Sequence, residues 1–280
     1  MPDRRAVEPD LVPRQLNDMG IVSVLLGSLL LCACLTFLLI GCARKVPTLE
    51  VADLPVSVVI EHLEEKKEQL LSFRAVGSIR VKGEQQRWSG RAFFLTQLPG
   101  SLRLEVLSFF GQPVLYAASD GYEFMIWEPG HNRAYQGLAA RGTLARLIKF
   151  PLHDQEALLL LAGVVPMGHQ VEKKLFKLPD NGKMLLQLED VSSRLTQRVW
   201  LEGESLVATR IERTRGDELK LVATFSDFMD IEGWFYPKNI VMEGGKSRVN
   251  IRYEQISINE RLDQTVFQLN LPEGVEIIPW

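Results

Sequence analysis

Apolar and polar side chains alternate with a period of two through most of this sequence, from residue 73 to residue 259. In the stretch SLRLEVLS, for example, Leu102, Leu104 and Val106 fall on one face of an extended strand, and the charged residues between them fall on the other. The stretches VNIRY, which begins at Val249, and LKLVATF, which begins at Leu219, repeat this pattern. A chain built of such segments is expected to form a sheet with one apolar face, and that face must be covered.

Turn sequences such as Pro99-Gly100 and Asp120-Gly121 divide the alternating region into strands. No βαβ helices intervene, so the pattern indicates one large antiparallel sheet, curved or closed, rather than a parallel one. We expect about ten to twelve strands on this scale. They are predicted at 73–83, 86–96, 101–108, 114–119, 122–128, 172–178, 183–191, 196–203, 205–214, 218–228, 236–244 and 247–259.

A helix is predicted to precede the sheet at 56–71. Val59, Leu63, Leu70 and Leu71 lie near one face of such a helix. The charged run between them lies largely on the opposite face, where water is expected to solvate it. The segment therefore predicts an amphipathic helix that packs on the sheet.

Two further helices are predicted at 142–150 and 154–165, and Pro151 separates them. They are the available cover for the apolar face of the sheet. The covered space is either a filled core or a cavity for an apolar guest, and periodicity does not separate these two. The side chains expected to line it are Leu102, Leu104, Val106, Leu144, Leu147, Ile148, Leu221, Phe225 and Ile251.

An uncharged apolar run, Ile21 to Ile40, is long enough to cross a bilayer as a helix. The sequence Leu39-Ile40-Gly41-Cys42 at its end resembles the lipobox of bacterial lipoprotein precursors, in which the cysteine thiol receives diacylglycerol before cleavage. The run is longer than the usual signal-peptide core of about 7–15 residues, and acidic residues precede it. A retained membrane helix and a later start at Met19 therefore stay open as alternatives.

Lipidation of Cys42 divides the chain into a signal peptide at 1–41, a lipidated cysteine with a tether at 42–55, and a folded domain at 56–280. Several acyl chains on one cysteine hold a protein stably on a membrane. In the lipoproteins that this segment resembles, an aspartate after the cysteine favours the inner membrane, and Ala43 favours the outer one. The expected location is the periplasmic face of the outer membrane of a Gram-negative bacterium.

Composition and motifs argue against several classes of function. The net charge of −3 supplies no global basic field for nucleic acid. All three cysteines lie at or near the apolar run, so the folded part has none for a disulfide, a zinc site or a nucleophile. The four histidines lack H-E-x-x-H spacing, and no G-x-S-x-G elbow is present. We expect no enzymatic activity, no metal and no cofactor.

Four stretches, at 73–81, 101–111, 235–240 and 262–278, resemble the LolA/LolB superfamily of bacterial lipoprotein carriers and receptors. They read F-R-x-x-G-x-I-x-V, S-L-R-L-E-V-L before an exposed F-F-G, F-x-P-x-x-I, and L-x-Q-x-V-F-x-L-x-L-P-x-G. The resemblance implies a half-open, incomplete antiparallel β-barrel of about eleven strands, lidded by helices, whose apolar hollow shelters acyl chains.

The lipid-anchored member of that family is the outer-membrane receptor, and the anchor inferred at Cys42 points to the same member. The resemblance then implies a monomer that accepts acylated lipoproteins from a periplasmic LolA-like carrier and inserts them in the membrane. In that family, a loop between early strands projects an apolar side chain for this delivery, and Phe109 and Phe110 stand at the matching position here. The alternative is a non-enzymatic structural, assembly or lipid-binding envelope lipoprotein whose half-barrel is filled.

Overall fold

One continuous sheet dominates the computed structural model, which describes residues 50–84, 87–139, 152–168, 172–179 and 182–279. Its fifteen described strands follow the spatial order β1-β8-β9-β10-β11-β12-β13-β14-β2-β3-β4-β5-β6-β7-β15. Every neighbouring pair is antiparallel except β15 with β7. The strands are β1 (Glu50–Val51), β2 (Ser72–Lys82), β3 (Arg87–Gln97), β4 (Ser101–Leu107), β5 (Pro113–Asp120), β6 (Glu123–Glu128), β7 (Arg133–Leu138), β8 (Glu172–Lys177), β9 (Lys183–Asp190), β10 (Leu195–Glu202), β11 (Val207–Arg215), β12 (Glu218–Ile231), β13 (Trp234–Gly244), β14 (Ser247–Ile258) and β15 (Glu276–Pro279).

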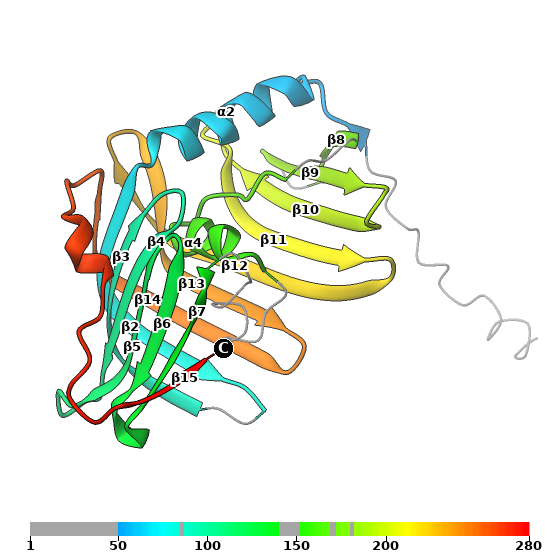
Figure 1. Ribbon diagram of the computed structural model, residues 1–280. Coiled ribbons are helices and arrows are strands. Elements are labelled where there is room, and N and C mark those ends of the chain that lie inside the picture. The colour runs from blue at the N-terminus through cyan, green and yellow to red at the C-terminus, as the bar shows by residue number, and fades with distance from the viewer. Residues whose placement is uncertain (1–49, 85–86, 140–151, 169–171, 180–181, 280) are drawn as a thin grey trace, which may run out of the picture. The chain divides into compact units, whose positions relative to one another are not determined.

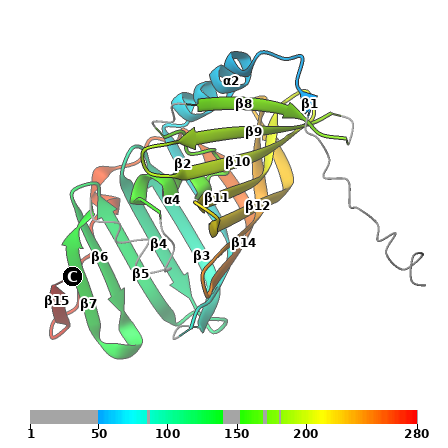
Figure 2. The same ribbon diagram turned by 90° about the vertical axis from the view of Figure 1, so that its right-hand side faces the viewer.

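The prediction of a single large antiparallel sheet is confirmed. The twelve strands expected from alternation correspond to β2–β6 and β8–β14. Three strands were not predicted from the sequence, namely β1, β7 and β15, so the sheet has more strands than the eleven or twelve expected. β15 runs parallel to β7 at one edge of the sheet. Figures 1 and 2 show that the sheet curls into an unclosed half-barrel with β1 and β15 at its two free edges.

Two glycines allow neighbouring strands of this curled sheet to approach closely. A Cβ atom on Gly77 of β2 would lie 2.1 Å from the carbonyl oxygen of Arg252, and one on Gly90 of β3 would lie 2.1 Å from that of Leu107. The register of β14 against β2 shifts beside Gly77, between Tyr253 and Gln255. A β-bulge of this kind bends a strand and increases its twist.

Helix α2 (Val56–Gln69) lies along one end of the sheet, as Figure 1 shows. It buries Val59, Ile60 and Leu63, which confirms the amphipathic helix expected there. The helix ends at Gln69 instead of continuing to Leu71. Leu71 is 64% exposed, contrary to the expectation that it shares the buried face, because it belongs to the link into β2.

Helix α4 (Asp154–Leu161) lies against the concave face of the half-barrel (Figures 1 and 2). It buries Ala157, Leu158, Leu159 and Leu160. The Glu156 side chain accepts a hydrogen bond from the backbone nitrogen of His153 at 3.0 Å, which satisfies a donor at the start of the helix. The other predicted helix, at 142–150, lies outside the described residues, as do Leu144, Leu147 and Ile148.

The segment after β14 crosses the convex side of the sheet, shown in red in Figure 1, and includes the short helix η3 (Gln264–Phe267). Phe267 is 2% exposed. Arg103 of β4 donates through Nη1 to the carbonyl oxygens of Val266 at 2.8 Å and Gln268 at 3.1 Å. These contacts direct the chain to the far edge, where β15 pairs with β7.

The turns that join successive strands lie alternately at the two ends of the half-barrel. We call the end at α2 the helix end, and the opposite end, which carries the β2–β3, β4–β5 and β13–β14 hairpins, the hairpin end. Residues 49–280 form one compact unit. Because this unit contains the whole described core, we expect it to fold by itself. None of the described helices is long and apolar enough to span a membrane.

The close strand approach at Gly77 gives a stability prediction. Gly77→Ala would force a Cβ atom against the Arg252 carbonyl, so we expect it to lower the free energy of unfolding by about 2–3 kcal/mol. Gly130→Ala is the control, because a Cβ there would meet nothing within 4 Å, and it should change stability by less than about 0.5 kcal/mol. Urea unfolding of residues 49–280 measures both, and equal losses would contradict the prediction.

Candidate functional site

The apolar concave face collects the described side chains that were expected to line an interior. Leu102, Leu104 and Val106 of β4 lie there with Leu221 and Phe225 of β12 and Ile251 of β14, and none is more than 6% exposed. Leu219 is 52% exposed, although alternation placed it on the same face. The register of β11 against β12 shifts between Arg213 and Thr214, which is where Leu219 pairs.

A small cavity of about 30 Å³ lies between α4 and this face. A water molecule needs about 10–15 Å³ measured in this way, whereas sites for drug-sized ligands have about 300–1,000 Å³. The cavity is therefore a packing gap with an apolar wall, and a guest of acyl-chain size fits there only if α4 moves. The lining residues are Ile79, Trp88, Phe94, Leu102, Leu104, Ala157, Leu161, Met242, Val249 and Ile251.

A buried polar network fastens the start of α4 to the sheet. Glu156 forms an ion pair with Arg213 of β11, with 2.7 Å between Oε1 and Nη2, and the Arg213 side chain is only 6% exposed. Arg213 Nε also donates to Gln197 Oε1 at 2.6 Å, and Gln197 Nε2 donates to the Pro166 carbonyl at 2.9 Å. Burial alone would raise the pKa of Glu156, but the hydrogen bond and charge of Arg213 outweigh it and hold this pKa below its ordinary value.

Two more side chains hold the end of α4 and the turn after it. Tyr253 of β14 donates through its hydroxyl to the Leu161 carbonyl at 2.8 Å. Burial raises the pKa of Tyr253, so its hydroxyl keeps the proton that it donates. Lys66 of α2 donates to the Gly163 carbonyl at 3.3 Å. The helix that covers the concave face is thus fixed at both ends by polar contacts, while its middle packs through apolar side chains.

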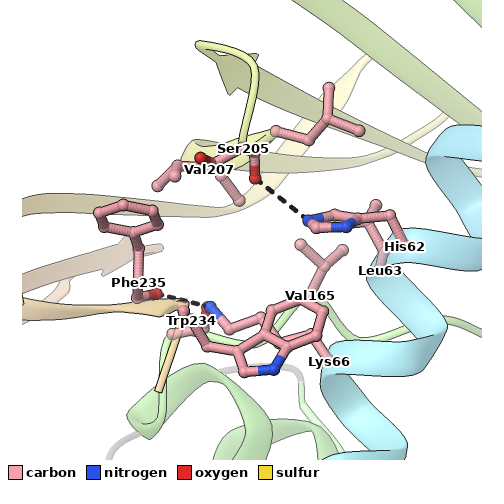
Figure 3. A pocket seen from close by; sticks show the side chains of 12 residues that line it. His62, Leu63, Lys66, Val165, Ser205, Val207, Trp234 and Phe235 are labelled. Carbon is pink, nitrogen blue, oxygen red and sulfur yellow. Dashed lines mark hydrogen bonds between the residues drawn. The ribbon is translucent and has the colours of Figure 1, made fainter. Parts of the chain in front are cut away.

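Lys66 also joins α2 to the β12–β13 turn, as Figure 3 shows. Its Nζ donates to the Phe235 carbonyl at 2.7 Å and lies 4.9 Å from the centroid of the Tyr236 ring. Burial lowers the pKa of Lys66 to about 8. None of the described carboxylates forms an ion pair with it. His62 lies beside it, with Nε2 at 3.1 Å from the Ser205 carbonyl oxygen.

Phe109 and Phe110 form an exposed aromatic tip at the β4–β5 hairpin. They are 96% and 86% exposed, and their rings meet edge to face with centroids 5.5 Å apart. The turn is closed by a hydrogen bond from Gly111 N to the Ser108 carbonyl at 2.9 Å, and Gly111 has a positive φ of 77°, which favours glycine. Adjacent side chains of an extended chain point to opposite sides, so at least one of these two rings is expected to be exposed or in a turn. In the structure both are exposed.

The remaining predicted site residue, Cys42, lies outside the described part of the chain. Sequence reasoning missed the fastening residues Glu156, Arg213, Gln197 and Lys66. A signal for two of them is present: Gln197 precedes the buried Val199 by two positions, and Arg213 follows the buried Ile211 by two. Each polar residue therefore falls on the apolar face of its strand, and the register places them opposite each other.

No protein-family model matches the sequence, and no curated protein matches it. Solved structures resemble its fold. A LolA superfamily protein from Nitrosomonas europaea aligns with a TM-score of 0.50 and 11% identity over 77% of this chain and 98% of that one. A protein domain from Vibrio parahaemolyticus, described in terms of outer-membrane lipoprotein sorting, aligns at 0.51 and 10% over 76% and 97%. A DUF1329 family protein from Desulfovibrio piger aligns at 0.52 and 11% over 76% and 97%.

The buried pair of Glu156 and Arg213 predicts an asymmetric mutational response. Glu156→Leu leaves a buried guanidinium without its carboxylate, so we expect a loss of about 3–5 kcal/mol in unfolding free energy. Arg213→Met should cost less, because the Glu156 side chain is 22% exposed and can turn to water. The double variant should lose at least about 1 kcal/mol less than the sum of the two. Urea unfolding of the four proteins completes the cycle, and strict additivity would contradict the coupling.

The lowered pKa of Lys66 predicts a pH dependence. Between pH 8 and 10.5 the unfolded chain, in which this lysine has its ordinary pKa of 10.5, binds more protons than the folded chain. Stability therefore rises with pH across this window, and wild type should gain about 3 kcal/mol relative to Lys66→Met between pH 7 and 10.5. Urea midpoints measured from pH 7 to 10.5 test this, with Lys67→Met as the matched loss of a lysine from α2. A flat difference between wild type and Lys66→Met would contradict it.

Proposed function

We propose that this chain, whose fold is that of the LolA/LolB superfamily, is a lipid-anchored lipoprotein of the outer membrane. It accepts acylated lipoproteins from a periplasmic LolA-like carrier and helps to insert them in the membrane. The observation that carries the proposal is the apolar concave face of the half-barrel, which a single described helix, α4, covers across an apolar cavity. A face covered in this way can exchange the apolar side chains of α4 for the acyl chains of a guest.

The exchange needs no covalent chemistry, so we propose a protein without enzymatic activity. Each methylene group that leaves water contributes about 0.8 kcal/mol. Burial of an acyl chain can therefore compensate for the apolar packing that is lost when α4 moves away from the concave face. When the interior is empty, the ion pair of Arg213 with Glu156 and the hydrogen bond from Tyr253 to the Leu161 carbonyl hold α4 in place. Transfer then runs toward whichever apolar environment buries the acyl chains better, first this interior and finally the bilayer.

Two features outside the interior support a place at a membrane. The lipobox-like sequence that ends at Cys42 would supply the anchor. The rings of Phe109 and Phe110 are exposed to solvent. Exposed apolar area of this kind is unfavourable in water and is typical of a surface that binds a membrane or a partner. Aromatic side chains favour the boundary between lipid and water, so this tip is suited to bring the half-barrel to the bilayer.

A second candidate function is favoured by the size of the cavity. At about 30 Å³ it is too small for an acyl chain, as expected of a filled half-barrel. The protein would then be a structural or assembly lipoprotein that binds an envelope partner through its surface. The two candidates differ in one measurable property, which is whether the interior opens for a lipid.

Acyl-chain transfer tests the proposed function. A labelled lipoprotein is loaded on its periplasmic carrier, residues 49–280 are added, and the two proteins are separated to find the label. We expect the label on this protein. Phe109→Ala with Phe110→Ala should leave that step intact and slow the later step into liposomes at least about tenfold, because each truncated ring removes apolar area from the membrane contact.

Tyr122→Ala is the matched control, because Tyr122 is also an exposed aromatic residue, at 82%, and it lies at the helix end. It should change neither step. Label that stays on a carrier shown to be competent toward another receptor would overturn the proposed function. That outcome would leave the filled half-barrel as the better account.

A further inference from the structure

A cluster of six cations covers the convex face of the half-barrel near the hairpin end. They project from three adjacent strands, β14, β2 and β3, on the side opposite the apolar face, and all are exposed. We call this cluster the basic patch. It consists of Arg80, Lys82, Arg87, Arg91, Arg248 and Arg252.

Strand register places three of these cations side by side. Arg248 pairs with Lys82, and Lys82 pairs with Arg87, so the three form one row across the strands. Side chains in directly opposite positions have Cβ atoms about 4.5–5.5 Å apart, and like charges at that spacing destabilise a sheet. The row therefore does not serve the stability of the fold, which points to a ligand that neutralises it.

The neighbouring carboxylates compensate only part of this charge. Glu243 pairs with Arg248 at 2.7 Å, and Glu254 pairs with Arg91 at 3.5 Å. Glu84, in the β2–β3 hairpin, forms an ion pair with Lys246 at 2.5 Å, and Lys246 lies outside the patch. The other four members of the patch form no ion pair with any described residue. A locally positive surface thus stands on a chain whose net charge is −3.

The basic patch lies beside the exposed aromatic tip. Arg91 of β3 pairs with Leu107 of β4, and Phe109 follows Leu107 by two residues. Lys82 and Arg87 border the β2–β3 hairpin, which is at the same end of the sheet as that tip. Cations and exposed phenyl rings are therefore adjacent on one side of the molecule, at the end away from α2.

We infer that the basic patch binds the surface of an anionic phospholipid bilayer while Phe109 and Phe110 enter its interface. Juxtamembrane cations gain affinity from anionic headgroups, and aromatic rings gain it from the boundary with the acyl chains. The combination favours a membrane over an acidic protein, because an acidic protein would satisfy the cations and not the rings. The inference relies on the proposed function only for placing the protein at a membrane.

Vesicle binding tests the inference without cargo or carrier. Residues 49–280 are sedimented with liposomes of phosphatidylcholine alone or with 30% phosphatidylglycerol. We expect binding to the anionic vesicles that weakens as salt rises. Each cation near such a surface contributes about fivefold to partitioning, so Lys82→Gln with Arg87→Gln should weaken binding about 25-fold. The same variant should unfold no more easily than wild type, since it relieves a row of like charges.

Lys173→Gln with Lys177→Gln is the matched control, because it removes the same charge from exposed positions on β8, which lies next to the edge strand β1 and away from the basic patch. It should change binding less than about twofold. An equal loss in both variants, or no preference for phosphatidylglycerol, would overturn the inference. Retention by an acidic carrier protein with no vesicle binding would overturn it in favour of a protein partner. Failed acyl transfer with intact vesicle binding would count against the proposed function alone.

Discussion

A single curved sheet with one apolar face has to cover that face without the help of a second sheet, and the rest of this structure depends on how it does so. Here α4 supplies the cover, packed through Ala157 and Leu161 against side chains of the surrounding strands. A short helix buries little area, so its position depends on polar fastenings at its ends. Arg213 and Tyr253 provide these from inside the sheet, where low polarity strengthens each contact.

The sheet could be predicted from sequence because alternation is a local signal. β7 escaped prediction because its six residues, RAYQGL, contain only a weak alternation. β15 escaped because its pairing with β7 joins residues more than 130 positions apart and runs parallel. Leu219 was assigned to the wrong face because a shift in register is set by the partner strand. The contact between Arg213 and Glu156 likewise depends on the position of α4 over the sheet, which no local sequence pattern specifies.

The two faces of the half-barrel differ in polarity. The concave face is apolar and carries a polar network where α4 is fastened, whereas the convex face is crossed by the segment that contains Phe267 and bears charge elsewhere. Alternation along each strand produces both faces at once, so a change in register would exchange them. This coupling explains why the positions of Gly77 and Gly90 matter, since they fix how adjacent strands approach.

The unclosed sheet has free edges, which in other proteins are templates for aggregation. At one edge β15 ends its pairing with β7 at Pro279, which has no N–H to offer a further strand. At the other edge β1 pairs with only two residues of β8, and the exposed Lys173 and Lys174 occupy part of the remainder. A half-barrel whose edges are protected in this way can stay open without joining edge to edge with copies of itself.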